Sequence, residues 1–211
     1  MLKYVNTGIV FQEIPDEVPL AINISGCPCR CPGCHSQYLW EDIGMPLTTD
    51  AIDEFVEKNG KDITCIAFMG GDAEPRRINR LAQYIHEEYP HLKVAWYSGK
   101  MRVPLEVNKD DFDYIKVGPY LQHLGPLNKP TTNQRLYRAL RPEDADSAVA
   151  IKPVLSQSAV SPEVYPAAAP SKLPSAAAAP EVSLHYFAGR PFQDITARFW
   201  HRGLDARRSS G

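Results

Sequence analysis

The sequence lacks the features that would assign it to a membrane or to a polyanionic partner. Its 211 residues contain no apolar run of about eighteen residues, which excludes a transmembrane helix by length. Lysine and arginine number 23 against 25 aspartates and glutamates, so no charge excess favours nucleic acid or an anionic membrane. The start lacks the cationic, apolar and small-residue regions of a secretory signal. We therefore expect a cytoplasmic protein with neither nucleic acid nor membrane as a partner.

Cysteine is scarce, yet four of the five cysteines fall within the segment GCPCRCPGCHSQYLW, residues 26–40. In a reducing compartment, clustered thiols favour metal or redox chemistry over disulfides. Zinc usually takes two pairs of ligands, and no second pair follows this segment. The spacing Cys27-x3-Cys31-x2-Cys34 can instead wrap a loop around a [4Fe–4S] cluster and leave one iron open to another ligand. The spacing favours the cluster and leaves zinc as the alternative.

The residues between these cysteines suit a tight loop. Pro28, Pro32 and Gly33 favour non-helical turns and let the backbone approach a cluster. Cys29 is an extra thiol inside the first gap, which we interpret as a bystander, with an alternative ligand or an oxidation-sensitive group as the other readings. Cys65 stands alone among apolar residues and is expected to be a small buried hydrophobe.

Strand and helix patterns alternate along the first two thirds of the chain. Strands are expected at residues 3–12, 18–25, 62–72, 93–99 and 113–120, and helices at 46–60 and 75–90, with a short acidic helical segment at 104–112. This alternation predicts parallel strands joined by right-handed crossovers, and hence an α/β fold.

The composition divides the chain into three parts. Residues 1–140 are predicted to form the domain, and residues 141–182 are rich in alanine and proline and read as a linker or insertion that buries too little apolar surface to order itself. Residues 183–211 regain aromatic side chains and are predicted to be a tail that can dock on the domain.

A second candidate binding feature follows the cysteine segment after one helical crossover. Two glycines at the end of a strand, Gly70 and Gly71, allow a ligand to lie against the sheet edge, and Asp72 can accept a hydrogen bond from a ligand ammonium group. Ser98 ends the next expected strand, where a ribose or carboxylate could reach it. Lys116 is read either as a buried partner for a carboxylate or as an edge residue whose ammonium group reaches solvent.

These motifs resemble a known family. GCPCRCPGC matches the C-x3-C-x2-C signature of radical S-adenosylmethionine enzymes, and MGGDAEP resembles their glycine-rich methionine-binding strand. CPGC and the later GPLNKPTTNQRLYRAL look closest to the activating protein of anaerobic (class III) ribonucleoside-triphosphate reductase, and FQDITARFW resembles tails of that group. The resemblance covers residues 1–140 and about 190–200, and omits the alanine- and proline-rich stretch.

The resemblance implies a fold, a site and a reaction. The fold would be an incomplete parallel β/α barrel with a flexible C-terminal extension. Cys27, Cys31 and Cys34 would ligate the cluster, and Gly70, Gly71 and Asp72 would hold the methionine end of S-adenosylmethionine. The backbone at Gly33 and the side chain of His35 would meet its adenine. Cys34 and Ser98 would also contribute to cofactor binding. One electron would cleave S-adenosylmethionine to methionine and a 5′-deoxyadenosyl radical, which would take a hydrogen atom from a glycine of the partner.

The same resemblance implies the partners and leaves alternatives open. The protein substrate would be the large subunit of the anaerobic reductase, and a flavodoxin or ferredoxin would donate the electron. His35 stands where the family often has an aromatic residue, and Ser36 where it has asparagine. The alternatives are an activase of another glycyl radical enzyme such as pyruvate formate-lyase, whose group often carries a second cysteine set that is absent here, and a non-catalytic zinc- or cluster-binding interaction module.

Overall fold

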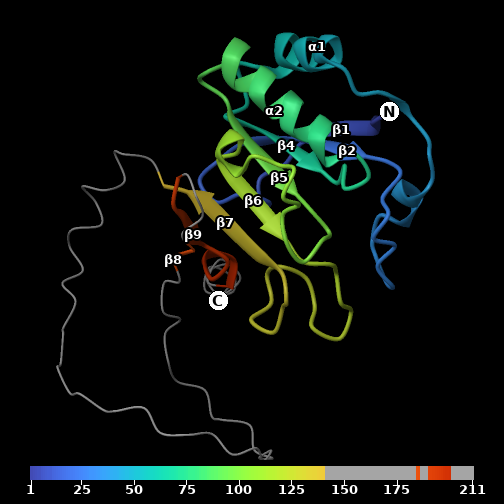
Figure 1. Ribbon diagram of the computed structural model, residues 1–211, viewed down its shortest axis with the longest axis vertical. Helices are drawn as coiled ribbons and strands as arrows, with labels where there is room; N and C mark the ends of the chain where they lie inside the picture. The colour runs from blue at the N-terminus through green and yellow to red at the C-terminus, as the bar shows by residue number, and fades with distance from the viewer. Residues whose placement is uncertain (141–183, 186–189, 201–211) are drawn as a thin grey trace, which may run out of the picture.

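The computed structural model describes residues 1–140, 184–185 and 190–200 (Figure 1). Their strands form one sheet in the order β3-β1-β2-β4-β5-β6-β7-β9-β8. The strands are β1 Lys3–Ile9, β2 Pro19–Ile24, β3 Met45–Pro46, β4 Cys65–Met69, β5 Lys93–Tyr97, β6 Tyr114–Val117, β7 Arg135–Ala139, β8 Leu184–His185 and β9 Phe192–Asp194. The helices are α1 Thr49–Asn59 and α2 Pro75–Glu88, with the short 3-10 helices η1 Gln37–Trp40 and η2 Lys109–Asp111.

The centre of the sheet is parallel and its flanks are antiparallel. β2, β4, β5 and β6 run parallel, with Ile22 opposite Phe68 and Phe68 opposite Trp96. β1 and β3 extend one side, and β7, β9 and β8 extend the other, all in antiparallel pairing. The predicted α/β class is therefore confirmed as a mixed sheet with a parallel centre, the antiparallel flanks were not predicted, and the partial-barrel form remains a prediction.

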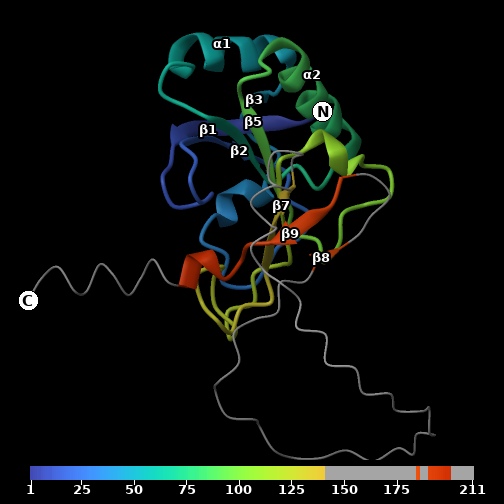
Figure 2. The ribbon, with the colours of Figure 1, turned by 90° about the vertical axis from the view of Figure 1, so that its left-hand side faces the viewer.

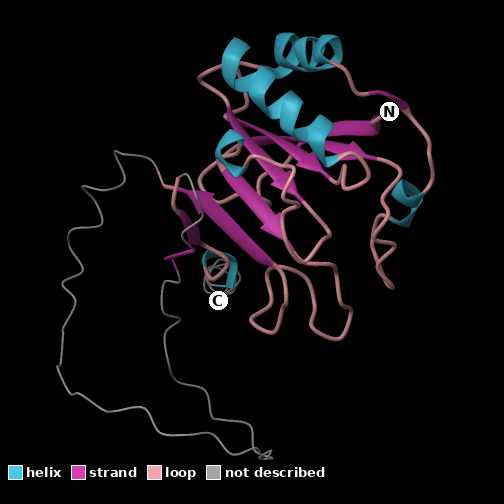
Figure 3. Ribbon diagram, viewed as in Figure 1, coloured by secondary structure: helices cyan, strands magenta, loops and turns pink. Residues whose placement is uncertain are grey.

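Both helices cover the same face of the sheet (Figures 2 and 3). The Thr48 hydroxyl accepts from the Ala51 N–H (3.3 Å) and caps α1. α2 starts at Pro75, where a missing N–H costs nothing, and ends before Pro90. In the part of the chain that the structure describes, neither helix has the length and apolarity needed to cross a bilayer.

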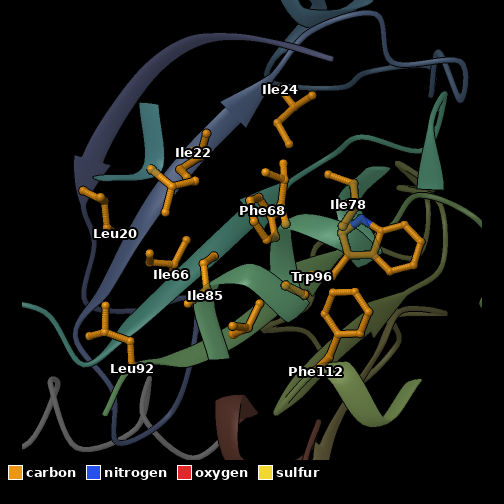
Figure 4. Packing of buried hydrophobic residues seen from close by; sticks show 14 of the residues in the cluster. Leu20, Ile22, Ile24, Ile66, Phe68, Ile78, Ile85, Leu92, Trp96 and Phe112 are labelled. Atoms are coloured by element: carbon orange, nitrogen blue, oxygen red, sulfur yellow. The ribbon is translucent and has the colours of Figure 1, made fainter. Parts of the chain in front are cut away.

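Two apolar layers hold the sheet. The larger lies between the sheet and the helices, where Phe68, Trp96 and Phe112 are fully buried and the last two stack with ring centroids 5.7 Å apart (Figure 4). The smaller lies on the opposite face, where Ile14 from one loop and Phe199 from the C-terminal segment help to cover the strands.

The C-terminal segment joins the sheet through backbone pairing. Tyr137 of β7 lies opposite Asp194 of β9, and the Leu136 N–H donates to the Thr196 hydroxyl (2.8 Å). Residues 190–200 are thus an integral edge of the structure, while the predicted linker at 141–182 lies outside the described residues.

Buried polar groups at the amino ends of the parallel strands serve the fold. Asp113 accepts from the Val94 N–H (2.9 Å) and from His86 (3.0 Å). Glu17 accepts from the Tyr114 hydroxyl (2.8 Å) and pairs with Lys93. These contacts join the loops and strands at the amino edge of the parallel strands.

Candidate functional site

The clustered cysteines lie on the loop that leaves β2 at the carboxyl edge of the parallel strands, the blue loop at the right of Figure 1. The two ends of this loop are tied together. The Gly26 N–H donates to the Glu41 carbonyl (2.9 Å), and the Cys27 N–H donates to the Leu39 carbonyl (2.9 Å). The backbone therefore holds the cysteine loop, residues 27–34, as a closed projection from the sheet.

The thiols of the cysteine loop are free and partly exposed, whereas Cys65 is fully buried in β4, as predicted. The Cys34 N–H donates to the Cys31 carbonyl (3.0 Å), and the Cys34 sulfur accepts from the Ser36 N–H (3.4 Å). A backbone donor of this kind stabilises a thiolate. Among the described residues, no three histidine, cysteine, aspartate or glutamate side chains already surround a metal-sized position.

A second loop packs against the cysteine loop. At Gly33, whose φ of +75° is left-handed, an added Cβ would lie 3.0 Å from the Gln122 side-chain oxygen, so glycine permits the two loops to touch. The His35 ring lies 5.8 Å from the ring of Tyr120. Between the loops is a cavity of about 400 Å³ lined by Pro32, Tyr120, Leu121, Gln122 and His123. Sequence reasoning missed residues 120–123, because nothing in their local pattern indicates which loop they meet.

The Gly-Gly-Asp turn ends β4 beside the cysteine loop. Gly70 and Gly71 have φ values of +108° and +87°, which side-chain-bearing residues rarely adopt. An added Cβ at Gly70 would lie 3.2 Å from the Ile24 carbonyl oxygen at the end of β2. The glycines thus let the end of β4 pack against the start of the cysteine segment.

Asp72 connects the ends of β4 and β5 and faces the cysteine loop. It is 3% exposed, and it accepts from the Ser98 hydroxyl (2.6 Å) and the Gly99 N–H (2.8 Å). The Cys29 thiol lies 3.9 Å from the same carboxylate. Burial, followed by the charges of Asp72, Cys27 and neighbouring Cys31, raises the pKa of the Cys29 thiol to about 12. The cysteine loop and the ends of β4 and β5 therefore meet at the Asp72 carboxylate.

Lys116 places a buried ammonium group near Asp72 and the cysteine loop. Its side chain is buried, and its ammonium group donates to the carbonyls of Gly118 (2.7 Å) and Ser98 (3.4 Å). Burial lowers the pKa of Lys116 to about 8, and the nearby negative charge of Asp72 and the loop thiols opposes that shift. The reading of Lys116 as a solvent-reaching edge residue is wrong, because the turn at Gly118 folds the chain over its ammonium group.

The model of one protein family, the 4Fe-4S single cluster domain, matches residues 18–130, from the start of β2 to the loop after β6. The match spans more than half of the chain. The chain belongs to this family. No curated protein and no solved structure gave a significant match to this 4Fe-4S single cluster domain.

The residues of the domain fit a [4Fe–4S] cluster. Thiolates are the ligands that such clusters take, and Cys27, Cys29, Cys31 and Cys34 supply four unpaired thiols on one loop. The Ser36 N–H and the Lys116 ammonium group offer hydrogen-bond and charge compensation for the sulfurs. The family match supports the predicted cluster over zinc and disulfides, while the choice of ligating cysteines remains a prediction.

The structure brings the other predicted site residues to the same edge. Gly70, Gly71, Asp72 and Ser98 lie at the ends of β4 and β5, and Gly33, Cys34 and His35 lie on or directly after the cysteine loop. Their proposed contacts with S-adenosylmethionine remain predictions.

Proposed function

We propose that this 4Fe-4S single cluster domain is a radical S-adenosylmethionine activase that generates a glycyl radical on the large subunit of an anaerobic ribonucleoside-triphosphate reductase. One juxtaposition carries the proposal: the cysteine loop meets Asp72, Ser98 and Lys116 at the carboxyl ends of parallel strands. A buried carboxylate and a buried ammonium group beside a cluster loop complement the charged amino-acid end of S-adenosylmethionine.

Cys27, Cys31 and Cys34 would hold the cluster, which supplies one electron for the reductive cleavage of S-adenosylmethionine when it is bound. Asp72 would accept a hydrogen bond from the amino group of the ligand. Its Oδ1 accepts from Ser98 and retains a further lone pair, while its Oδ2 accepts from Gly99 and faces the Cys29 thiol.

Lys116 would pair with the carboxylate of the ligand. Its ammonium group has three donors, and two of them are directed at backbone carbonyls. The cavity between the loops, together with Gly33, Cys34 and His35, would take the adenine. Tyr120 lines this cavity, and the His35 ring lies 5.8 Å from the Tyr120 ring. The same residues would orient the ligand and limit the entry of water.

The first test is reductive cleavage. Anaerobically reconstituted protein should contain about four irons and about four sulfides per chain, and dithionite should drive release of methionine and 5′-deoxyadenosine. Cys31→Ala should lose both the cluster and the cleavage, while Cys65→Ala should retain both. Zinc without sulfide in the active preparation would reject the proposal.

The second test concerns the partner. The holoprotein, S-adenosylmethionine and a reductant are mixed with the reductase large subunit or with pyruvate formate-lyase, and the glycyl radical doublet is followed by electron paramagnetic resonance. The proposal predicts a doublet with the reductase, and flavodoxin or ferredoxin should replace dithionite. A doublet only with pyruvate formate-lyase would favour the alternative activase. Absence of S-adenosylmethionine binding in calorimetry would favour a non-catalytic interaction module.

A further inference from the structure

Cys29 is the one thiol of the cysteine loop that the proposed chemistry leaves unused. The C-x3-C-x2-C spacing accounts for Cys27, Cys31 and Cys34. Burial among apolar neighbours accounts for Cys65, whose thiol donates to the Ile66 carbonyl (3.6 Å). Cys29 has neither explanation, because it is partly exposed and lies within the loop that fits a cluster.

The Cys29 side chain turns toward the strand ends. Its sulfur lies 3.9 Å from an oxygen of Asp72, and a Cβ added to Gly99 would come within 2.7 Å of the sulfur. Cys29 is two residues from Cys27 and two residues from Cys31 along the loop. Cys29 therefore lies between its fellow cysteines and the edge where the amino-acid end of a ligand would bind.

We propose that Cys29 is a fourth thiolate ligand of the cluster in the ligand-free protein and is displaced when a ligand with adjacent amino and carboxylate groups binds beside Asp72. The displacement half of this inference rests on the proposed function. The thiol loses its proton to solvent when the Fe–S bond forms. On displacement the Fe–S bond would break and the ligand nitrogen and oxygen would replace the sulfur on iron. The ligand ammonium group would release one proton so that its nitrogen can bind, the departing Cys29 sulfur would take up one proton, and no electron would move.

The protective role of Cys29 follows from the number of thiolates that the four irons of the cluster have available. Three thiolates leave one iron with an exchangeable ligand, and such an iron is the first to be lost on oxidation. A fourth thiolate from within the loop needs no rearrangement of the strands, because Cys29 is only two residues from both Cys27 and Cys31. The domain would thus protect its cluster until the ligand arrives.

Mössbauer spectroscopy of the reconstituted wild-type protein tests the assignment without any variant. Four thiolate-bound irons should give no distinct subsite in the ligand-free protein, and S-adenosylmethionine should create one. A distinct iron subsite that is already present before the ligand is added would overturn the proposal.

Oxidation of matched variants provides a second readout. Ferricyanide should convert the cluster of Cys29→Ala to the three-iron form about tenfold faster than that of the wild type, as followed by electron paramagnetic resonance. Cys65→Ala, which also removes one thiol, should behave like the wild type. Equal conversion rates for Cys29→Ala and the wild type would contradict a fourth thiolate.

Calorimetry with S-adenosylmethionine separates this inference from the proposed function. Cys29→Ala should bind the ligand more tightly than the wild type, because no thiolate has to leave. Tight binding with a distinct subsite present from the start refutes the role of Cys29 and retains the proposed function. A saturated cluster and no binding, even by Cys29→Ala, refutes the proposed function and the displacement step but retains the fourth ligand.

Discussion

Asp72 and Lys116 are both more than nine-tenths buried, and the hydrogen bonds of both go to neutral groups. Asp72 accepts from Ser98 and Gly99, while Lys116 donates to the carbonyls of Ser98 and Gly118. Buried charges held this way keep their capacity to bind an ion of opposite charge, whereas a closed ion pair would already be satisfied. At the scale of residues, this arrangement supports the proposed ligand site.

Replacement of Asp72 by asparagine should weaken S-adenosylmethionine binding. The change retains size but removes the negative charge, and a hydrogen bond to a charged group contributes about 1.5–3 kcal/mol, or about 10- to 150-fold in Kd. Calorimetry on the reconstituted variant measures this loss.

Asp113→Asn is the matched control, because Asp113 is an equally buried carboxylate at the amino edge of the sheet. It should lower stability and leave the ligand Kd unchanged. Equal effects of the two variants on Kd would show that Asp72 acts only through the fold.

Binding should also depend on pH through Lys116. Burial lowers the pKa of this ammonium group to about 8, so the binding-competent charge is present below that pH and is lost as pH rises through it. The Kd should therefore rise between about pH 7 and about pH 9 in the wild type. Lys116→Met should bind weakly at both values, and Lys116→Arg, which stays charged, should show little pH dependence. An unchanged pH profile in Lys116→Met would contradict a role for the ammonium group.

The elements were predictable where local sequence dictates them. The cap at Thr48, the proline at the start of α2 and the apolar runs of β4 and β5 all specify structure within a few residues. β7 was missed, because residues 135–139 form a strand by antiparallel pairing with β6 and β9, which are both distant in the sequence. Long-range pairing of this kind leaves little local signal.

In the candidate site, too, local features were predictable from the sequence and long-range contacts were not. The cysteines, the Gly-Gly-Asp turn and Ser98 were predictable, because their chemistry or their place at a strand end appears in the sequence. The burial of Lys116 was not, because it depends on the turn at Gly118, and the contact of Gly33 with Gln122 depends on two distant loops.

The turn after β4 gives a test at the scale of elements. Gly71→Ala should lower the free energy of unfolding by about 1–3 kcal/mol, because φ is left-handed and the new methyl group meets Ile78. Gly8→Ala is the control, since no atom lies within 4 Å of a Cβ added in β1. Anaerobic thermal unfolding of both holoproteins measures the difference. Equal stabilities would mean that the turn does not hold the end of β4 in the conformation described.

At the scale of the whole molecule, the two edges of the parallel strands differ in the residues that they carry. The amino edge is joined by Glu17, Lys93 and Asp113, which bind other parts of the chain. The carboxyl edge carries the cysteine loop, the Gly-Gly-Asp turn and the loop of residues 118–130 (Figures 1 and 2). Parallel strands gather ligand sites at this edge, because the loops that follow them converge there.

The family match spans this carboxyl edge completely, from β2 to residue 130. The antiparallel strands β7 and β9 lie outside the matched residues, and β9 belongs to the C-terminal segment. The cluster site and the sheet edge closed by the tail are therefore separate features of the molecule.

Electron–nuclear double resonance on the reduced holoprotein tests the central claim most directly, with S-adenosylmethionine labelled at its amino nitrogen and at its carboxylate. If one iron of the cluster binds the amino-acid end of this ligand beside Asp72 and Lys116, both labels should show hyperfine coupling to the cluster. A reduced cluster that shows no coupling to either label at saturating ligand would contradict the account.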